Sequence, residues 1–88
     1  MQQRKMVIAN SIGLHARPAA LMTQAAKKFS AKIQLQKGDK KANAKSITEI
    51  MLLAVKSGEE VVIIAEGNDE KEAIEYIEQL VENKFGEA

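Results

Sequence analysis

The alternation of apolar and polar residues predicts that this chain begins with a strand followed by a helix. Met6 and Ile8 share one face of a strand over residues 4–9, and residues 10–13 are typical of a loop. From residue 16 to about residue 29, strong helix formers surround apolar positions at helical spacing. Pro18 suits the first turn of this helix, where its missing N–H would have no intrahelical acceptor. The apolar positions are Ala19 or Ala20, Met22, Ala26 and Phe29.

The following segment predicts a hairpin and a short helix. Residues 32–36 alternate, with Ile33 and Leu35 inward, and residues 37–40 form a turn before a return strand over 40–44. Ser46 and Glu49 have the spacing of a capping box, in which the serine accepts from a backbone N–H and the glutamate reaches back. We expect a helix over about residues 47–55, ended by Ser57-Gly58.

The last third of the chain predicts a strand and an amphipathic helix. Residues 61–65 are apolar at every position, which indicates an interior strand covered at least partly on both faces. Asp69 and Glu72 repeat the capping-box spacing and open a helix that runs to about Asn83. Its inward positions are Ala73, Ile74, Ile77, Leu80 and Val81.

The element order is therefore βαββαβα, in one domain over residues 1–88. Such an order packs helices on one face of a mostly antiparallel sheet. We predict an α+β open-faced β-sandwich with four strands and three helices on one face.

The chain has no Cys, which excludes disulfide miniproteins and thiolate zinc sites. Its apolar runs fall far short of the roughly 20 residues of a membrane span, and no signal-like segment opens it, so we expect a cytoplasmic protein without a membrane partner.

The net charge of +1 conceals a division along the chain. Residues 1–45 contain ten Lys or Arg and only Asp39 as an acid, a net +9. Residues 46–88 contain three Lys and eleven acids, Glu87 among them, a net −8. The division favours a fold with a basic face and an acidic or phosphorylated partner.

Candidate chemistry is confined to one residue, His15. The chain has one His, no Cys and no glycine-rich phosphate loop, so most enzyme classes lack their parts. His15 directly precedes the first helix, whose N-terminal N–H groups and partial positive charge suit a phosphate, and Arg17 adds a guanidinium. This arrangement suits a reversible phosphohistidine. The alternative is a structural histidine that caps the helix or packs on the sheet.

Residues 13–20, Gly-Leu-His-Ala-Arg-Pro-Ala-Ala, resemble the phosphorylation motif of the HPr family of histidine-containing phosphocarriers. The resemblance covers the whole chain, including Lys45-Ser46-Ile47 and the acidic last helix. It implies a carrier, not an enzyme, that accepts a phosphoryl group from enzyme I of the phosphoenolpyruvate:sugar phosphotransferase system. The carrier then passes the group to sugar-specific IIA domains. It also implies the sheet order 1-4-2-3.

The resemblance assigns roles to individual residues. His15 would accept phosphate through Nδ1, Arg17 would contact the phosphoryl group, and Pro18 would fix the helix start. The backbone N–H groups of Ala16 and Arg17 would complete the anion site. No cofactor, metal or nucleic acid is implied, and the carrier would be a monomer with transient partners.

Ser46 matches the second phosphorylation site of the family. An ATP-dependent HPr kinase/phosphorylase modifies this site in many Gram-positive bacteria, and the product binds the catabolite control protein. A role as helix N-cap explains Ser46 equally well. Glu49, in the same turn, would repel a phosphate. Ile12 and Thr48 are further departures from the family pattern.

The family's docking surface would map here onto apolar residues of the second helix and basic residues nearby. The alternative for the apolar residues is a place in the core. The candidates are Ile47, Met51, Leu52, Arg17, Lys27 and Lys45.

Three other functions compete with the sugar phosphotransferase relay. A regulatory paralogue within the family would have the same site. A small RNA-binding module would use the +9 half, although Phe29, Tyr76 and Phe85 all fall outside the predicted strands and offer no stacking platform. An adaptor with a merely capping His15 would bind partners without phosphoryl transfer.

Overall fold

The computed structural model describes residues 1–86. Residues 87–88, and with them Glu87 and the predicted end of the domain, lie outside the described residues. The βαββαβα order is confirmed. The elements are β1 (Gln2–Val7), α1 (Ala16–Ala26), β2 (Lys32–Lys37), β3 (Lys40–Asn43), α2 (Ile47–Leu52), β4 (Glu60–Glu66), α3 (Glu70–Glu82) and a 3-10 turn (Lys84–Gly86).

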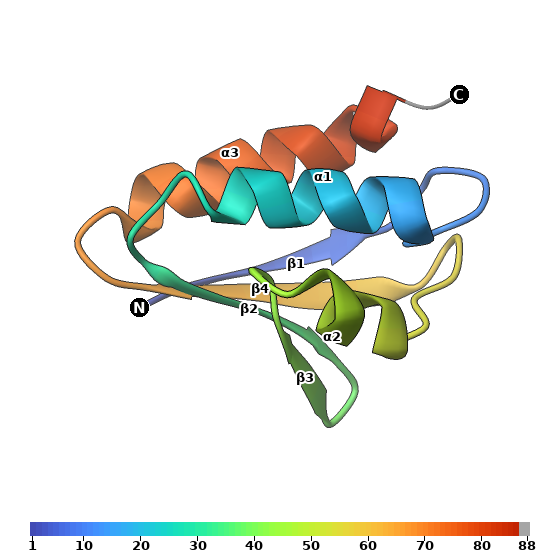
Figure 1. The fold of residues 1–88 in the computed structure, drawn as a ribbon, viewed down its shortest axis with the longest axis horizontal. Helices are drawn as coiled ribbons and strands as arrows, with labels where there is room; N and C mark the ends of the chain where they lie inside the picture. The colour runs from blue at the N-terminus through green and yellow to red at the C-terminus, as the bar shows by residue number, and fades with distance from the viewer. Residues whose placement is uncertain (87–88) are drawn as a thin grey trace.

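The four strands form one antiparallel sheet in the order β1-β4-β2-β3, as the family resemblance implies. β4 is the interior strand that its continuous apolar run predicts. Helices α1 and α3 lie side by side over one face of the sheet, and α2 packs against α1 and β3 (Figure 1). The predicted α+β open-faced sandwich is confirmed.

The core lies between the sheet and the two long helices. Ile33, Leu35 and Ile63 project from the sheet and are fully buried, as are Met22 of α1 and Ile77 of α3. Burying a side chain of this size contributes about 1.5–3 kcal/mol. The alternation on β2 and the helical periodicity of α3 therefore correspond to one shared apolar layer.

Ile64 is buried even though it faces away from the helices, with an exposed fraction of 7%. The strand register places Gln3 of β1 and Gln34 of β2 directly beside it. Side chains paired in this way across a sheet are close neighbours, which accounts for the burial of Ile64 without a second layer. The expectation that this strand is partly covered on both faces is thus correct.

Helices α1 and α2 end earlier than the sequence pattern predicts. After Ala26 the hydrogen bonds shorten to three-residue spacing, from Lys28 N to Ala25 O and from Phe29 N to Ala26 O. Helix α2 stops at Leu52 because Ala54 has a left-handed φ of 54°, which the α-helix excludes. Ser57-Gly58 therefore lies in the loop after α2 and does not end the helix.

The predicted capping box at Asp69 is wrong. Asp69 occupies the N-cap position of α3, but its carboxylate accepts from the backbone N–H groups of Ser30 and Ala31, at 2.9 and 2.8 Å. Gly67 packs so tightly on Ala31 that a Cβ there would lie 2.8 Å from the Ala31 Cα, and this contact brings the β2 entry within reach of Asp69. The hydrogen bond from Ser30 is the main reason that the pKa of Asp69 is lowered.

Candidate functional site

His15 is the N-cap residue of α1. Its backbone is extended, with φ −82° and ψ −170°, and its carbonyl oxygen accepts the first helical hydrogen bond from Ala19 N at 2.9 Å. The imidazole is half-buried and makes no side-chain capping hydrogen bond. The residue therefore stands where a cap is expected, but its ring does not perform the capping function.

The N–H groups of Ala16 and Arg17 precede the first intrahelical hydrogen bond, so the helix supplies them with no acceptor. Both residues are exposed beside His15, whereas Pro18 is buried in the first turn. The structure therefore places the imidazole and two backbone donors at one helix end, and the exposed Arg17 side chain starts from the same turn. This combination of groups suits a phosphoryl dianion.

The loop before His15 is held by backbone contacts. The Asn10 side chain, fully buried, donates to the carbonyl oxygen of Gly13 at 2.7 Å, and Gly13 N donates to Asn10 O at 3.2 Å. Leu14 N donates to Val55 O at 3.0 Å. These bonds fix the chain immediately before the helix against the loop that follows α2.

The loop after α2 is fixed by a charged pair. Lys37 Nζ lies 3.1 Å from Glu59 Oε1 and donates to the carbonyl oxygens of Leu53 and Ala54 at 3.3 and 3.0 Å. Glu59 Oε1 also accepts from Lys56 N at 2.7 Å. This backbone hydrogen bond is the largest cause of the lowered pKa of Glu59, and the hydrogen bond from Lys37 is the second.

Ser46 is the N-cap of α2, as predicted. Its Oγ accepts from Glu49 N at 3.3 Å, but the Glu49 carboxylate accepts from Asn43 N at 3.0 Å and does not reach back to Ser46. The capping box is therefore half correct. The reason is that Ser46 N already donates to Asn43 O, which leaves the Asn43 N–H at the end of β3 as the donor for Glu49.

The two candidate phosphorylation sites lie at opposite ends of the α1–α2 pair. Leu14, before α1, contacts Val55, after α2. Lys45, before α2, donates through Nζ to Phe29 O, after α1, at 2.8 Å. The helices are therefore antiparallel, and Ser46 lies next to the far end of α1 from His15. Lys27, the C-cap of α1, lies at that far end too.

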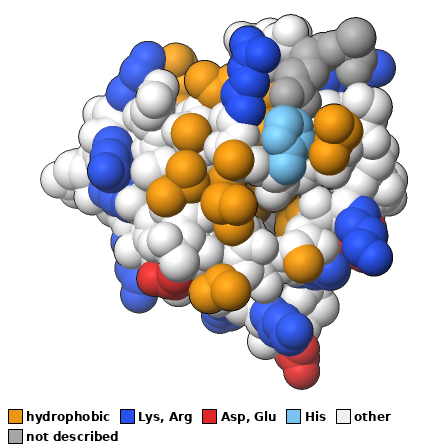
Figure 2. All heavy atoms as spheres, turned by 45° about the vertical axis from the view of Figure 1, so that its right-hand side comes forward, with side chains coloured by type: hydrophobic (Ala, Val, Ile, Leu, Met, Phe, Trp, Pro, Cys, Tyr) orange, Lys and Arg blue, Asp and Glu red, His pale blue; other side chains and the backbone are white. Residues whose placement is uncertain are grey.

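An exposed apolar patch lies on α2, the helix whose C-terminal end is followed by the Val55 contact with Leu14. Ile47, Met51 and Leu52 have exposed fractions of 38, 45 and 75%, whereas Ile50 and Leu53 on the same helix are buried. Figure 2 shows apolar side chains gathered next to the histidine, with Lys and Arg around the margin. The alternative that Ile47 belongs to the core is wrong, because it lies on the outward side of α2.

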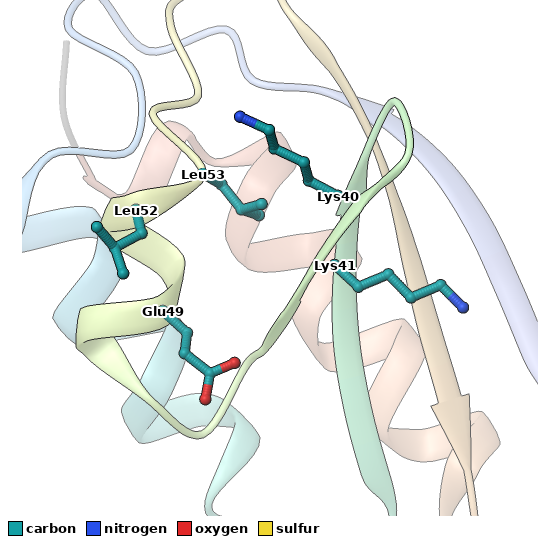
Figure 3. A pocket seen from close by; sticks show the side chains of 5 residues that line it. All are labelled: Lys40, Lys41, Glu49, Leu52 and Leu53. Carbon is teal, nitrogen blue, oxygen red and sulfur yellow. The ribbon is translucent and has the colours of Figure 1, made fainter.

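The patch continues into a groove between α2 and β3. The groove has a volume of about 300 Å³ and is lined by Lys40, Lys41, Glu49, Leu52 and Leu53 (Figure 3). Its carboxylate, that of Glu49, is already engaged by the Asn43 N–H. The groove therefore adds no separate constellation of reactive groups, and only Leu52 of its lining belongs to the apolar patch.

Sequence reasoning missed the residues that support the site. Lys37 is the last residue of β2 and Glu59 lies in the loop before β4, so no local spacing connects them. Ile12, identified only as a departure from the family pattern, is 67% exposed and enlarges the apolar surface. Only the family motif pointed to Gly13.

None of the helices within residues 1–86 combines the length and the apolar character that crossing a membrane requires.

The family model of the phosphotransferase-system HPr component, described by its phosphorylation site, matches residues 2–83. The chain belongs to the HPr family.

Individual relatives agree with this assignment. The chain is 46% identical to the phosphocarrier protein HPr of Treponema pallidum over 91% of each chain. An HPr structure from Thermoanaerobacter tengcongensis is 52% identical, with a TM-score of 0.97 over 100% of this chain and 99% of that one. A Bacillus subtilis Crh structure is 46% identical, with a TM-score of 0.77 over 96% of this chain and 97% of that one. That catabolite-repression protein is described as a swapped dimer.

Proposed function

We propose that this chain carries a phosphoryl group on His15 between phosphorylated enzyme I and the IIA domains of sugar permeases. The observation that carries the proposal is the half-buried imidazole at the N-cap of α1, next to the N–H groups of Ala16 and Arg17. Membership of the HPr family supports it. Such a relay operates in the cytoplasm, where we place this protein.

The transfer would exchange one imidazole for another. Nδ1 of His15, with its proton on Nε2, would attack the phosphorus, and the phosphorus–nitrogen bond to enzyme I would break. The donor phosphohistidine, protonated on its other ring nitrogen, then leaves as a neutral imidazole, and His15 becomes a phosphoimidazole that keeps its Nε2 proton, so no net proton transfer is needed. The N–H groups of Ala16 and Arg17 and the Arg17 guanidinium would stabilise the phosphoryl oxygens during transfer. The chain would act as a stoichiometric carrier rather than an enzyme.

The test is incubation with enzyme I and phosphoenolpyruvate, followed by intact mass and acid lability. We expect one acid-labile phosphate on the wild type and none on His15→Ala. A folded wild type that stays unmodified beside an HPr control phosphorylated by the same enzyme I would refute the proposal. Preference for a dedicated regulatory enzyme I over the sugar-system one would identify a regulatory paralogue.

We further propose that partners dock on Ile47, Met51 and Leu52, with Arg17 beside the apolar surface and Lys27 and Lys45 at its far end. Exposure of all three apolar residues supports this surface. The basic residues would steer the association with acidic partners. Since the core closes within one chain, we propose a monomer, and light scattering at increasing concentration tests it against a swapped dimer.

Regulatory phosphorylation of Ser46 by HPr kinase/phosphorylase is a second proposal, supported by the similarity to Crh. The modified protein would bind the catabolite control protein. The Glu49 carboxylate lies beside the same turn, so a phosphate on Ser46 would meet a like charge. Incubation with ATP and the kinase is expected to modify the wild type and not Ser46→Ala. Failure of both to react would exclude this site.

A further inference from the structure

We propose that Lys37 and Glu59 form a positioning pair that holds the His15 loop in the geometry for phosphoryl transfer. The inference rests on the proposed function. Neither residue belongs to the phosphorylation motif or to the proposed docking patch. Their side chains are about one-third exposed, at 28 and 38%, and they join the end of β2 to the loop that follows α2.

Lys37 contacts three oxygens in that loop. Its Nζ lies 3.1 Å from Glu59 Oε1, 3.0 Å from the carbonyl oxygen of Ala54 and 3.3 Å from that of Leu53. As the last residue of β2, Lys37 is anchored by pairing with β3. The Lys37 ammonium therefore ties the loop after α2 to the sheet.

The loop includes a conformation that requires such a tie. Ala54 has a φ of 54°, a left-handed conformation that is unfavourable for a residue with a Cβ. The carbonyl of this residue is one of those held by Lys37. A strained backbone persists only where its surroundings hold it, and here the ammonium supplies part of that restraint.

From the pair, contacts lead directly to His15. Glu59 Oε1 accepts from Lys56 N at 2.7 Å, which closes the turn adjacent to Val55. Val55 O accepts from Leu14 N at 3.0 Å, and Leu14 immediately precedes His15. Displacement of the loop after α2 would thus move the backbone from which the imidazole projects.

The pair would affect transfer through geometry alone, because it does not touch the candidate acceptor. Phosphoryl transfer between two imidazoles depends mainly on alignment and charge stabilisation. A displaced Leu14 would misalign Nδ1 with the incoming phosphorus. The docking patch on the outer side of α2 would keep its surface. The pair should therefore influence the transfer rate and leave partner affinity unchanged.

The experiment compares Lys37→Met with Lys41→Met. Both changes remove one positive charge from the same hairpin, and Figure 3 shows the Lys41 side chain directed away from α2. Three quantities are measured: the rate of transfer from phosphorylated enzyme I, the affinity for enzyme I, and hydrogen exchange at the Leu14 amide. Lys37→Arg tests rescue by a second cation, and thermal unfolding confirms that each variant is folded.

We expect Lys37→Met to slow transfer by about tenfold, since small misplacements of reacting groups have effects of this order or larger. Its affinity for enzyme I should equal that of Lys41→Met, and its Leu14 amide should exchange faster. Transfer at the Lys41→Met rate, or equal losses in rate and affinity, would overturn the proposal.

A second variant keeps the test decisive if Lys37→Met fails to fold. Glu59→Gln retains an oxygen that can accept from Lys56 N and removes only the charge facing Lys37. It should show the same pattern more weakly, and wild-type rate and exchange in this variant would overturn the proposal. If the wild type itself accepts no phosphate, the proposed function is wrong, whereas Leu14 exchange still reports whether the pair holds the loop.

Discussion

Gly13 lies so close to Val55 that no side chain fits between them: a Cβ on Gly13 would stand 2.5 Å from the Val55 carbonyl oxygen. Gly13 also has a φ of 83°. The requirement for glycine is therefore both steric and conformational. Because Gly13 is two residues before His15, this contact places the loop of the motif against the loop that follows α2.

Gly13→Ala should destabilise the protein and slow phosphate acceptance. Strain at the positive φ alone costs roughly 1–3 kcal/mol, and the clash with Val55 adds to it. Gly38→Ala is the matched control, because Gly38 also has a positive φ, of 61°, but no atom lies within 4 Å of its added Cβ. Urea unfolding measures both. Equal losses in the two variants would show that the contact with Val55 contributes nothing.

Ala54→Gly should stabilise the protein by about 1 kcal/mol. Glycine removes the penalty of the left-handed backbone, and the greater entropy of the unfolded chain offsets part of that gain. The same change at Ala20, inside α1, should destabilise by about as much. Thermal unfolding of the two variants checks both signs. A less stable Ala54→Gly would mean that the strain at this position is negligible.

Asp69→Asn should reduce stability most at neutral pH. The hydrogen bond from Ser30 is the main reason that the pKa of Asp69 lies below its ordinary value of 3.8 in the folded protein. A lowered folded-state pKa gives stability that is complete above the unfolded-state pKa and disappears as the pH falls through the folded-state pKa. The difference between wild type and variant should therefore shrink on acidification.

Urea unfolding across the acid range measures this difference. Glu75→Gln removes a charge from the exposed face of the same helix and gives the background effect of one lost carboxylate. A difference for Asp69→Asn that stays constant down to the lowest pH would contradict the assigned role of its carboxylate.

Leu52→Gln should weaken docking without changing stability beyond about 0.5 kcal/mol, the usual range for exposed positions. Leu52 is 75% exposed, so its removal from the apolar patch affects a partner more than the core. Val7→Gln removes another exposed apolar side chain, from the uncovered sheet face, and is the control. Calorimetric titration with enzyme I measures both affinities. Unchanged affinity for Leu52→Gln would exclude this residue from the interface.

Within residues 1–86, the four strands and the three α-helices could be predicted because each side-chain pattern is local, whereas the 3-10 helix at Lys84–Gly86 was not predicted. Alternation at Ile33 and Leu35 and helical spacing at Ile74 and Ile77 report burial on one face, and both pairs are buried. The limits of elements were less accurate. The early end of α2 depends on the backbone of Ala54, and the missing cap at Asp69 depends on donors 38 and 39 residues away.

The fold class, the His15 motif and the helix start at Ala16 could be read from the amino-acid sequence alone, since these depend on neighbouring residues and short-range periodicity. The side chains that support that motif became apparent only in the folded protein. Val55 contacts the chain just before His15, and Lys37 and Glu59 hold the loop that contains Val55. The folded sheet brings these distant residues together, and no local spacing records such contacts. The orientation of α2 likewise determined that Met51 and Leu52 face outward while Leu53 enters the core.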